Sequence, residues 1–235
     1  MGAMKVFLDT DRMVLRRFTG EDLELIIELD SDPAVKRYID NGAPIDRDDL
    51  VETLDWWLGY YERFEGYGFW AAIEKSTRQF LGWFHFRPGK GAGPLEPELG
   101  YRLRREAWGK GYATEGSRAL IDKGFLELGV ERVYAGTMAV NTGSRRVMEK
   151  SGLRFARTFH ADWPVRIPGD EEGDVEYAID RTQWEADRAA AAGIDDKLAL
   201  DETAYLLRSP ANARRLRESL NHARSGAMQE HELDQ

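Results

Sequence analysis

The chain has 235 residues, of which 33 are basic and 42 acidic, and its formal net charge is -9. This length predicts one large domain or one domain with an appendage, and the hydrophobic content of 42% is that of a globular protein with a core. The acidic balance argues against a nucleic-acid binder, and the absence of cysteine excludes disulfides, thiolate nucleophiles and Cys-based metal sites.

The sequence shows neither a membrane-spanning segment nor a signal peptide. No apolar run approaches the roughly 20 residues that span a bilayer, and the first residues contain no apolar signal-peptide core. The lack of cysteine fits a reducing compartment. We therefore expect a soluble cytoplasmic protein with no membrane contact. The four histidines are scattered, so no metal site is expected.

The first part of the chain predicts a strand, two helices and a hairpin. Alternating apolar residues predict a strand at 12–18, and Thr19 is the expected N-cap of the helix that follows. An apolar stripe at helical spacing predicts a second helix over 46–64. Residues 68–88 are expected to form a hairpin around a polar turn near 76–78.

The middle of the chain alternates strands and helices. The expected elements are strands at 98–103 and 132–140, helices at 113–128 and 141–152, and closing strands at 153–162 and 174–181. Strand, turn, helix and strand in this order predict that part of the sheet is parallel, with antiparallel hairpins elsewhere.

The composition changes after Trp184. The following residues are Ala-rich and helical in pattern, and Ser209 with Pro210 marks the start of another helix. We expect a domain over 1–184 and a helical extension with a polar tail over 185–235.

The stretch "EAWGKGYATEG" places two glycines, Gly109 and Gly111, directly before a predicted helix. Lys110 is followed by Gly111, so the Walker A pattern fails, and Thr114 stands where a dinucleotide fingerprint needs its third glycine. The physics still suits an anion, because glycines admit positive φ and a helix N-terminus carries partial positive charge. A bare G-x-G before a helix is nevertheless more often only a turn.

The order of motifs around this loop resembles the GNAT acyltransferases, and within them the RimJ/RimL-like branch. "DTDRMVLRRFTGEDLELIIELDSDPAVKRYI" is similar to the opening strand and helix of that branch, and "ELGYRLRREAWGKGYATEGSRALI" to its acetyl-CoA segment. "AVNTGSRRVMEKSGLRF" and "DVEYAIDRTQWE" resemble its closing motifs. The resemblance covers about residues 8–184.

This resemblance implies an α/β (α+β) GNAT fold: a mixed, mostly antiparallel sheet flanked by helices, in which the parallel strands 98–103 and 132–140 splay apart. Acetyl-CoA, the acetyl donor, lies in the gap, with its diphosphate on backbone N–H groups of 108–113. One departure is Glu106, where the family often has Gln or Arg; Arg104 and Arg105 are the alternative source of positive charge. The implied CoA-binding residues are Tyr101, Leu103, Arg104, Trp108, Gly109, Lys110, Gly111, Tyr112, Ala113, Thr114, Asn141 and Ser144.

The leaving CoA thiolate needs a hydrogen-bond donor. Many GNATs use a Tyr whose position here is Met148, which cannot donate. RimL-like proteins use a Ser in the same helix, which the resemblance carries over to Ser144, after an Asn like Asn141. The alternative is that both residues only cap that helix.

The general base is expected to be Glu98, at the head of its strand, although a solvated strand-edge carboxylate is the alternative. His85 is a second candidate, and a packed, hydrogen-bonded histidine is the plainer interpretation. Asp174 and Glu176 are further carboxylates near the expected acceptor side, and a water relay with no single base is also open.

The segment 200–226 resembles the toxin-binding half of YefM-type antitoxins. It implies docking on a RelE-like toxin, while packing on its own domain or forming a homodimer are the alternatives. We thus expect an acetyl-CoA-dependent N-acetyltransferase acting on a protein N-terminus or a small-molecule amine. The alternative function is a catalytically weak GNAT scaffold that binds partners through this tail.

Overall fold

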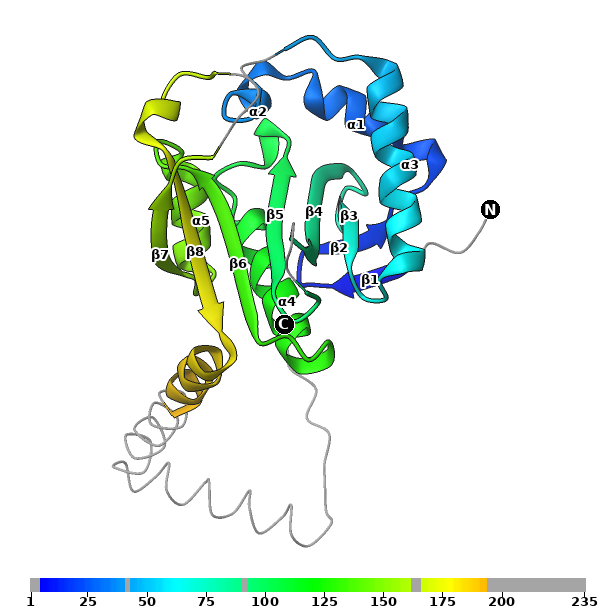
Figure 1. Ribbon diagram of the computed structural model, residues 1–235. Helices are drawn as coiled ribbons and strands as arrows, with labels where there is room; N and C mark the ends of the chain where they lie inside the picture. The colour runs from blue at the N-terminus through cyan, green and yellow to red at the C-terminus, as the bar shows by residue number, and fades with distance from the viewer. Residues whose placement is uncertain (1–4, 41–42, 90–92, 162–165, 194–235) are drawn as a thin grey trace, which may run out of the picture. The chain divides into compact units, whose positions relative to one another are not determined.

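The structure is a computed structural model that describes residues 5–40, 43–89, 93–161 and 166–193. Its strands (Figure 1) are β1 Val6–Asp9, β2 Met13–Arg17, β3 Gly68–Glu74, β4 Phe80–Pro88, β5 Pro97–Leu103, β6 Arg132–Met138, β7 Arg154–Phe159 and β8 Asp174–Asp180. Its helices are α1 Leu23–Asp30, α2 Pro33–Lys36, α3 Arg47–Arg63, α4 Tyr112–Glu127 and α5 Thr142–Lys150, with short 3-10 turns at Gly20–Asp22, Arg105–Ala107 and Asp170–Glu172.

Across the described ranges the strands form one eight-stranded sheet in the order β1-β2-β3-β4-β5-β6-β8-β7 (Figure 1). All neighbours are antiparallel except β5 and β6, which run parallel. β5 and β6 are in register at a single pair, Glu98 with Tyr134, whereas β5 and β4 share seven pairs. The two parallel strands therefore diverge toward their carboxyl ends and leave a V-shaped gap in the sheet, as expected.

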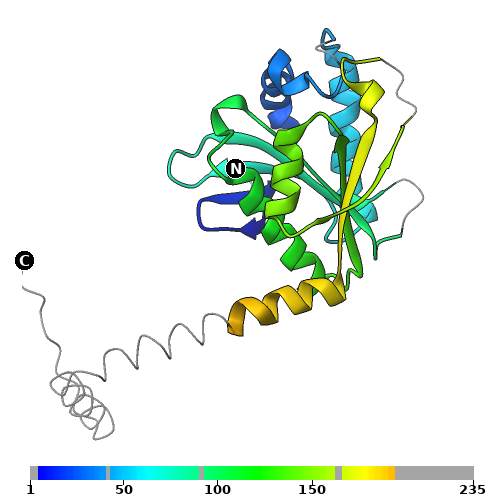
Figure 2. The same cartoon turned by 90° about the vertical axis from the view of Figure 1, so that its left-hand side faces the viewer.

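Helices cover the two faces of this sheet separately. In the side view α4 and α5 lie on one side of the sheet and α3 lies on the other (Figure 2). One core packs Leu120, Ile121 and Phe125 of α4 against the sheet. A second core packs Ile26, Leu54 and Trp57 against the opposite face. Alternate residues of β3 and β4 thus point into different cores, whereas the buried hydrophobic residues of β5 and β6 that belong to a core all lie in the first one.

Most of the predicted elements are confirmed, including the 68–88 hairpin and the helix after Thr19, which forms a capping box with Asp22. Two elements were missed. β1 is a four-residue edge strand with only half-buried central residues, so it has no alternation to detect. α2 has a single turn. The strand expected first, at 12–18, is therefore the second strand of the sheet.

Contacts divide the chain into two units, Met1–Trp184 and Glu185–Gln235. Residues 181–193 are helical, while Ser209, Pro210 and the antitoxin-like segment lie outside the described residues. Where the structure describes the chain, no helix combines the length and the apolar character needed to cross a bilayer.

Candidate active site

The Gly-Lys-Gly loop connects the carboxyl end of β5 to the amino end of α4. Gly109 and Gly111 have φ of 71° and 84°, in the left-handed region that favours glycine, and Gly111 is the N-cap of α4. A Cβ added to Gly109 would meet no atom within 4 Å. The backbone conformation therefore explains this glycine, and the space beside it is open to a ligand.

Hydrogen bonds within the loop show which N–H groups are already used. Trp108 donates its backbone N–H to Arg105 O at 3.0 Å and its indole Nε1 to Leu103 O at 2.8 Å. The first helical bond of α4 is the one from Glu115 N to Gly111 O, at 3.0 Å. The N–H groups ahead of Glu115 in the helix have no carbonyl one turn back. The backbone N–H groups available to an anion therefore shift by one residue, from the expected 108–113 to 109–114.

The three basic residues of this region lie on the side of α1 and α2. Arg104 Nη2 is 2.7 Å from Glu28 Oε2, and Arg105 Nε is 3.5 Å from Asp32 Oδ2. Lys110 lines a cleft of about 290 Å³ together with these pairs. Arg104 and Arg105 were the expected substitutes for the basic residue that Glu106 replaces. Their positive charge is partly neutralised by Glu28 and Asp32.

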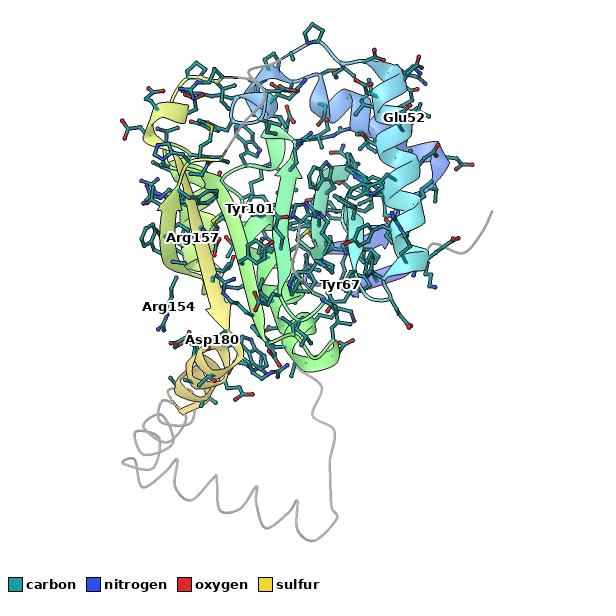
Figure 3. The ribbon with its side chains drawn as sticks, in the orientation of Figure 1. Glu52, Tyr67, Tyr101, Arg154, Arg157 and Asp180 are labelled. Carbon is teal, nitrogen blue, oxygen red and sulfur yellow. The ribbon has the colours of Figure 1, made fainter. Side chains whose placement is uncertain are left out.

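Tyr101 and Ser144 meet on the α4/α5 side of the sheet. The Tyr101 hydroxyl, from β5, lies 3.0 Å from Ser144 Oγ and 3.3 Å from Ser144 O, in α5 (Tyr101 is labelled in Figure 3). Burial raises the pKa of Tyr101 to about 12, although the bond with Ser144 acts in the opposite direction. Tyr101 therefore spans the distance between a strand and a helix at the open end of the gap.

The structure shows a capping side chain for Asn141 but not for Ser144. Asn141 is the cap, because its Oδ1 accepts from Ser144 N at 3.1 Å. The Ser144 hydroxyl is not needed for capping and faces Tyr101 instead. Met148, at the position where many family members have Tyr, is 3% exposed and belongs to the core.

Glu98 stands on the other face of β5, where the V closes. Its Oε2 is 3.0 Å from Arg87 Nη2 and 4.0 Å from His85 Nε2. Burial raises the pKa of the Glu98 carboxyl, and the charge of Arg87 offsets this only in part. A carboxylate with a raised pKa that is still 28% exposed is suited to accept a proton near neutral pH.

His85 packs against the rings of Trp83 and Phe69, and its side chain is 13% exposed. Burial lowers its pKa well below the usual value, and the nearby charges of Arg87 and Arg102 add to the effect. Its Nε2 has no hydrogen-bond partner among the described residues. His85 is therefore packed among aromatic rings, as in the plainer interpretation, but its Nε2 lacks the hydrogen bond that this interpretation expects, and the ring is a neutral neighbour of Glu98.

The two other carboxylates are engaged. Burial alone would raise the pKa of Glu176, but hydrogen bonds from Arg157 and Arg132 lower it. Asp174 is buried and accepts the N–H of Ala161 at 3.2 Å. Glu176 is therefore less suited to take up a proton than Glu98.

Sequence reasoning missed two of the groups around Glu98, Arg87 and Tyr134. Arg87 comes from β4, and the charges of Glu98 and Arg87 both act on the hydroxyls of Tyr60 and Tyr134. No sequence motif marks these residues, because they come together only through the strand register and the packing of α3 on the sheet. Among the described residues, no group of three His, Asp or Glu side chains is arranged to hold a metal ion.

A family model described as an acetyltransferase (GNAT) domain matches residues 12–154. The chain belongs to the GNAT family of acetyltransferases. The FsC-acetyl coenzyme A-N(2)-transacetylase of Aspergillus fumigatus is 33% identical over 183 residues, which are 75% of this chain and 77% of that protein. These matches favour an enzyme over a binding scaffold.

Solved structures agree on the fold of this GNAT protein. A GNAT-family acetyltransferase from Bacillus anthracis superposes with a TM-score of 0.61 at 27% identity, covering 74% of this chain and 98% of that one. RimL, a ribosomal alpha-N-protein acetyltransferase in complex with coenzyme A, gives 0.63 at 16% identity, covering 75% and 98%. At that identity, RimL supports the fold alone.

A separate, short match concerns the antitoxin YefM of Escherichia coli. It is 44% identical over 45 residues, which are 19% of this chain and 54% of the antitoxin. The match is to the same class of protein that the segment 200–226 resembles in sequence, and it covers about half of the antitoxin.

Proposed function

We propose that this GNAT enzyme belongs to the RimJ/RimL-like branch and transfers the acetyl group of acetyl-CoA directly to a primary amine. The observation that carries the proposal is the loop at Gly109 and Gly111 beside the gap between β5 and β6. The loop presents N–H donors at a helix N-terminus, where a diphosphate binds well. The gap exposes a strand edge along which the pantetheine arm can pair.

The two faces of β5 then have different roles. On one face Glu98 removes a proton from the acceptor amine, directly or through water. The amine nitrogen attacks the acetyl carbon, and backbone N–H groups of β5 near Leu103 stabilise the oxyanion. When the carbon–sulfur bond breaks, the thiolate accepts a hydrogen bond from Ser144 on the other face, supported by Tyr101.

The acceptor class follows from amine chemistry. An α-amine has a pKa of about 7.7–8.0 and a lysine amine about 10.4, so an α-amine needs far less help from Glu98. The Aspergillus relative is named for transfer to a nitrogen of its substrate. We propose an acceptor with a low-pKa primary amine, either a protein N-terminus or a small molecule.

Calorimetry with acetyl-CoA tests the proposal, with Gly109→Leu and Gly111→Leu as variants. We expect binding by the wild type and a large loss in both variants, because a side chain at positive φ is strained and occupies the space meant for phosphate. Thiol release with a panel of amines then identifies the acceptor. Absence of acetyl-CoA binding by the wild type would refute the function.

A second activity is proposed for the segment 200–226, supported by the 45-residue similarity to YefM. It binds a RelE-like toxin in the cytoplasm, as an addition to the enzyme. Co-purification of the full chain with such a toxin, compared with a chain that ends at residue 193, tests it; equal capture by both chains would refute it.

A further inference from the structure

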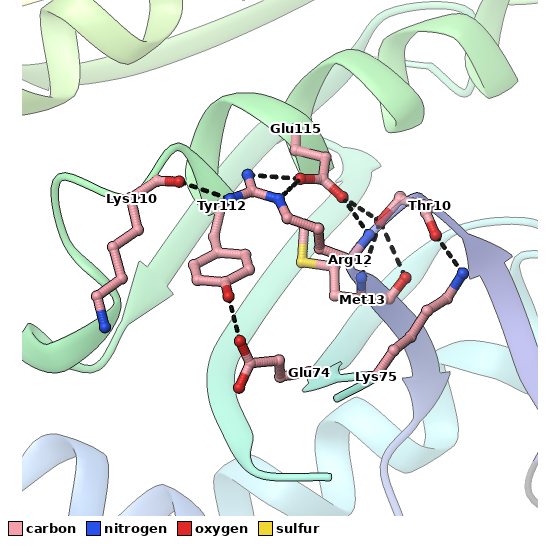
Figure 4. A network of polar contacts seen from close by, with 8 residues as sticks. All are labelled: Thr10, Arg12, Met13, Glu74, Lys75, Lys110, Tyr112 and Glu115. Atoms are coloured by element: carbon pink, nitrogen blue, oxygen red, sulfur yellow. Dashed lines mark hydrogen bonds and ion pairs between the residues drawn. The ribbon is translucent and has the colours of Figure 1, made fainter. Parts of the chain in front are cut away.

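The turn between β1 and β2 is bonded to the first turn of α4, about a hundred residues away in sequence (Figure 4). Glu115 is the centre of these contacts. Its Oε1 accepts from Arg12 N at 2.9 Å and from Thr10 Oγ1 at 2.7 Å, and its Oε2 accepts from Arg12 Nε at 2.7 Å. The turn after the edge strand β1 thus holds one side of the Gly-Lys-Gly loop.

The position of Glu115 poses an electrostatic problem for a diphosphate site. An ionised carboxylate in the first turn of a helix would repel an anion at the same N-terminus. Burial alone would raise the pKa of Glu115, but the hydrogen bonds from Thr10 and Arg12 lower it, so the group is ionised at neutral pH. Arg12 Nη2 lies 2.6 Å from Glu115 Oε2 and neutralises this charge locally.

Arg12 also reaches the loop backbone. Its Nη1 donates to Lys110 O at 2.8 Å. In a trans peptide the carbonyl and the following N–H point in opposite directions. Holding Lys110 O toward the β1–β2 turn therefore directs the N–H of Gly111 away from that turn.

The rest of the arrangement limits other orientations of this peptide. The Arg12 guanidinium lies 4.5 Å from the ring centroid of Tyr112, the first residue of α4, and the Tyr112 hydroxyl donates to Glu74. A Cβ on Gly111 would come within 3.3 Å of Arg12 Nη2. The loop is thus fixed against Arg12 on this side, and its opposite side is left for a ligand.

We propose that Arg12 and Glu115 are positioning residues of the acetyl-CoA site, which orient the Lys110–Gly111 peptide so that Gly111 N–H donates to the diphosphate. This rests on the proposed function. Arg12 touches no reacting atom: it acts through the peptide. Its side chain contributes to affinity for the diphosphate and not to the chemical step.

The test compares Arg12→Met with wild type for two ligands, coenzyme A and pantetheine, which lacks the diphosphate. Loss of one hydrogen bond to a charged group predicts about tenfold weaker coenzyme A binding. Pantetheine binding stays unchanged, and KM for acetyl-CoA rises while kcat is kept. Arg12→Lys, which can reach only one of the two partners, should restore part of the affinity.

Arg47→Met is the matched control, because Arg47 makes an exposed ion pair with Glu24 on the α1/α3 side. It should bind both ligands like wild type. Unchanged coenzyme A affinity in Arg12→Met, or equal losses for both ligands, would overturn the inference while leaving the acetyltransferase proposal in place. Failure of the wild type to bind coenzyme A would instead remove the proposed function itself.

Discussion

Replacing Glu98 by Gln tests the proposed base most directly. The carboxyl lies where the V between β5 and β6 closes, with its raised pKa limited by Arg87 at 3.0 Å. A positioned general base contributes about 10² to 10⁴ in rate. Because Glu98 is partly exposed and water can relay the proton, we expect the lower end, a loss of about 100-fold or about 2.7 kcal/mol in kcat/KM.

The role of Glu98 as a base also predicts the direction in which kcat/KM changes with pH. The base works only when ionised, so wild-type kcat/KM should fall on acidification through a pKa above the ordinary value of about 4.3. This step disappears in Glu98→Gln and leaves only the titration of the amine. Arg87→Met removes the charge that favours ionisation, so the step should move to higher pH.

The assay is steady-state thiol release with one α-amine acceptor between pH 4 and 9, a window that begins near the ordinary glutamate pKa of about 4.3, above which Glu98 titrates, and extends past the α-amine pKa of about 8. Glu96→Gln is the control, because Glu96 is exposed and pairs loosely with Arg132 at 3.7 Å. If Glu98→Gln keeps its kcat/KM within about twofold and an unaltered acid limb, Glu98 is not the base.

Three other predictions follow from particular contacts. Tyr101→Phe removes the hydrogen bond to Ser144, so kcat should fall about fivefold, or about 1 kcal/mol, with KM for acetyl-CoA unchanged. Adding Ser144→Ala to Tyr101→Phe should lower kcat little further, and strictly additive losses would contradict the coupling of the two residues. Gly116→Ala places a Cβ 2.4 Å from Phe84 Cζ and should destabilise by about 1–3 kcal/mol in urea unfolding, whereas Gly59→Ala, with no atom within 4 Å, should stabilise by up to about 1 kcal/mol. The pKa of Glu115 is lowered in the folded state, so its contribution to folding stability is complete above the unfolded pKa of about 4.3 and is lost as the pH falls through the folded pKa. Glu115→Gln should therefore flatten the acid side of a plot of the urea midpoint against pH.

The sequence was sufficient where function depends on local backbone geometry. Gly109 and Gly111 have the positive φ that their spacing before a helix suggests, and Asn141 caps α5. It was also sufficient for the succession of strands and helices from β2 onward, apart from the single-turn α2, because each motif lies on one element. These features need no information from distant parts of the chain.

Long-range pairing was beyond the sequence. Arg12 and Glu115 are 103 residues apart, and Tyr101 and Ser144 are 43 apart. Such contacts depend on strand register and helix packing. A shift of one residue in the register of a strand would move its side chains to the other face of the sheet. β1, the strand that leads into the turn containing Arg12, was missed because it is short and half-buried at the sheet edge.

The tyrosine that many family members have at the position of Met148 is missing, but another tyrosine hydroxyl reaches the same helix. A phenol does reach α5, but it comes from β5 as Tyr101 and ends at Ser144 rather than replacing it. With a pKa of about 12, Tyr101 stays protonated throughout the working range and serves as a hydrogen-bond donor, not as an acid. A thiol has a pKa of about 8.5, so its thiolate is a weak enough base to leave when stabilised by a hydrogen bond alone. If Tyr101 donates to Ser144 Oγ, the serine proton is free to point at the sulfur. The pair can therefore assist departure of the thiolate without a strong acid in α5.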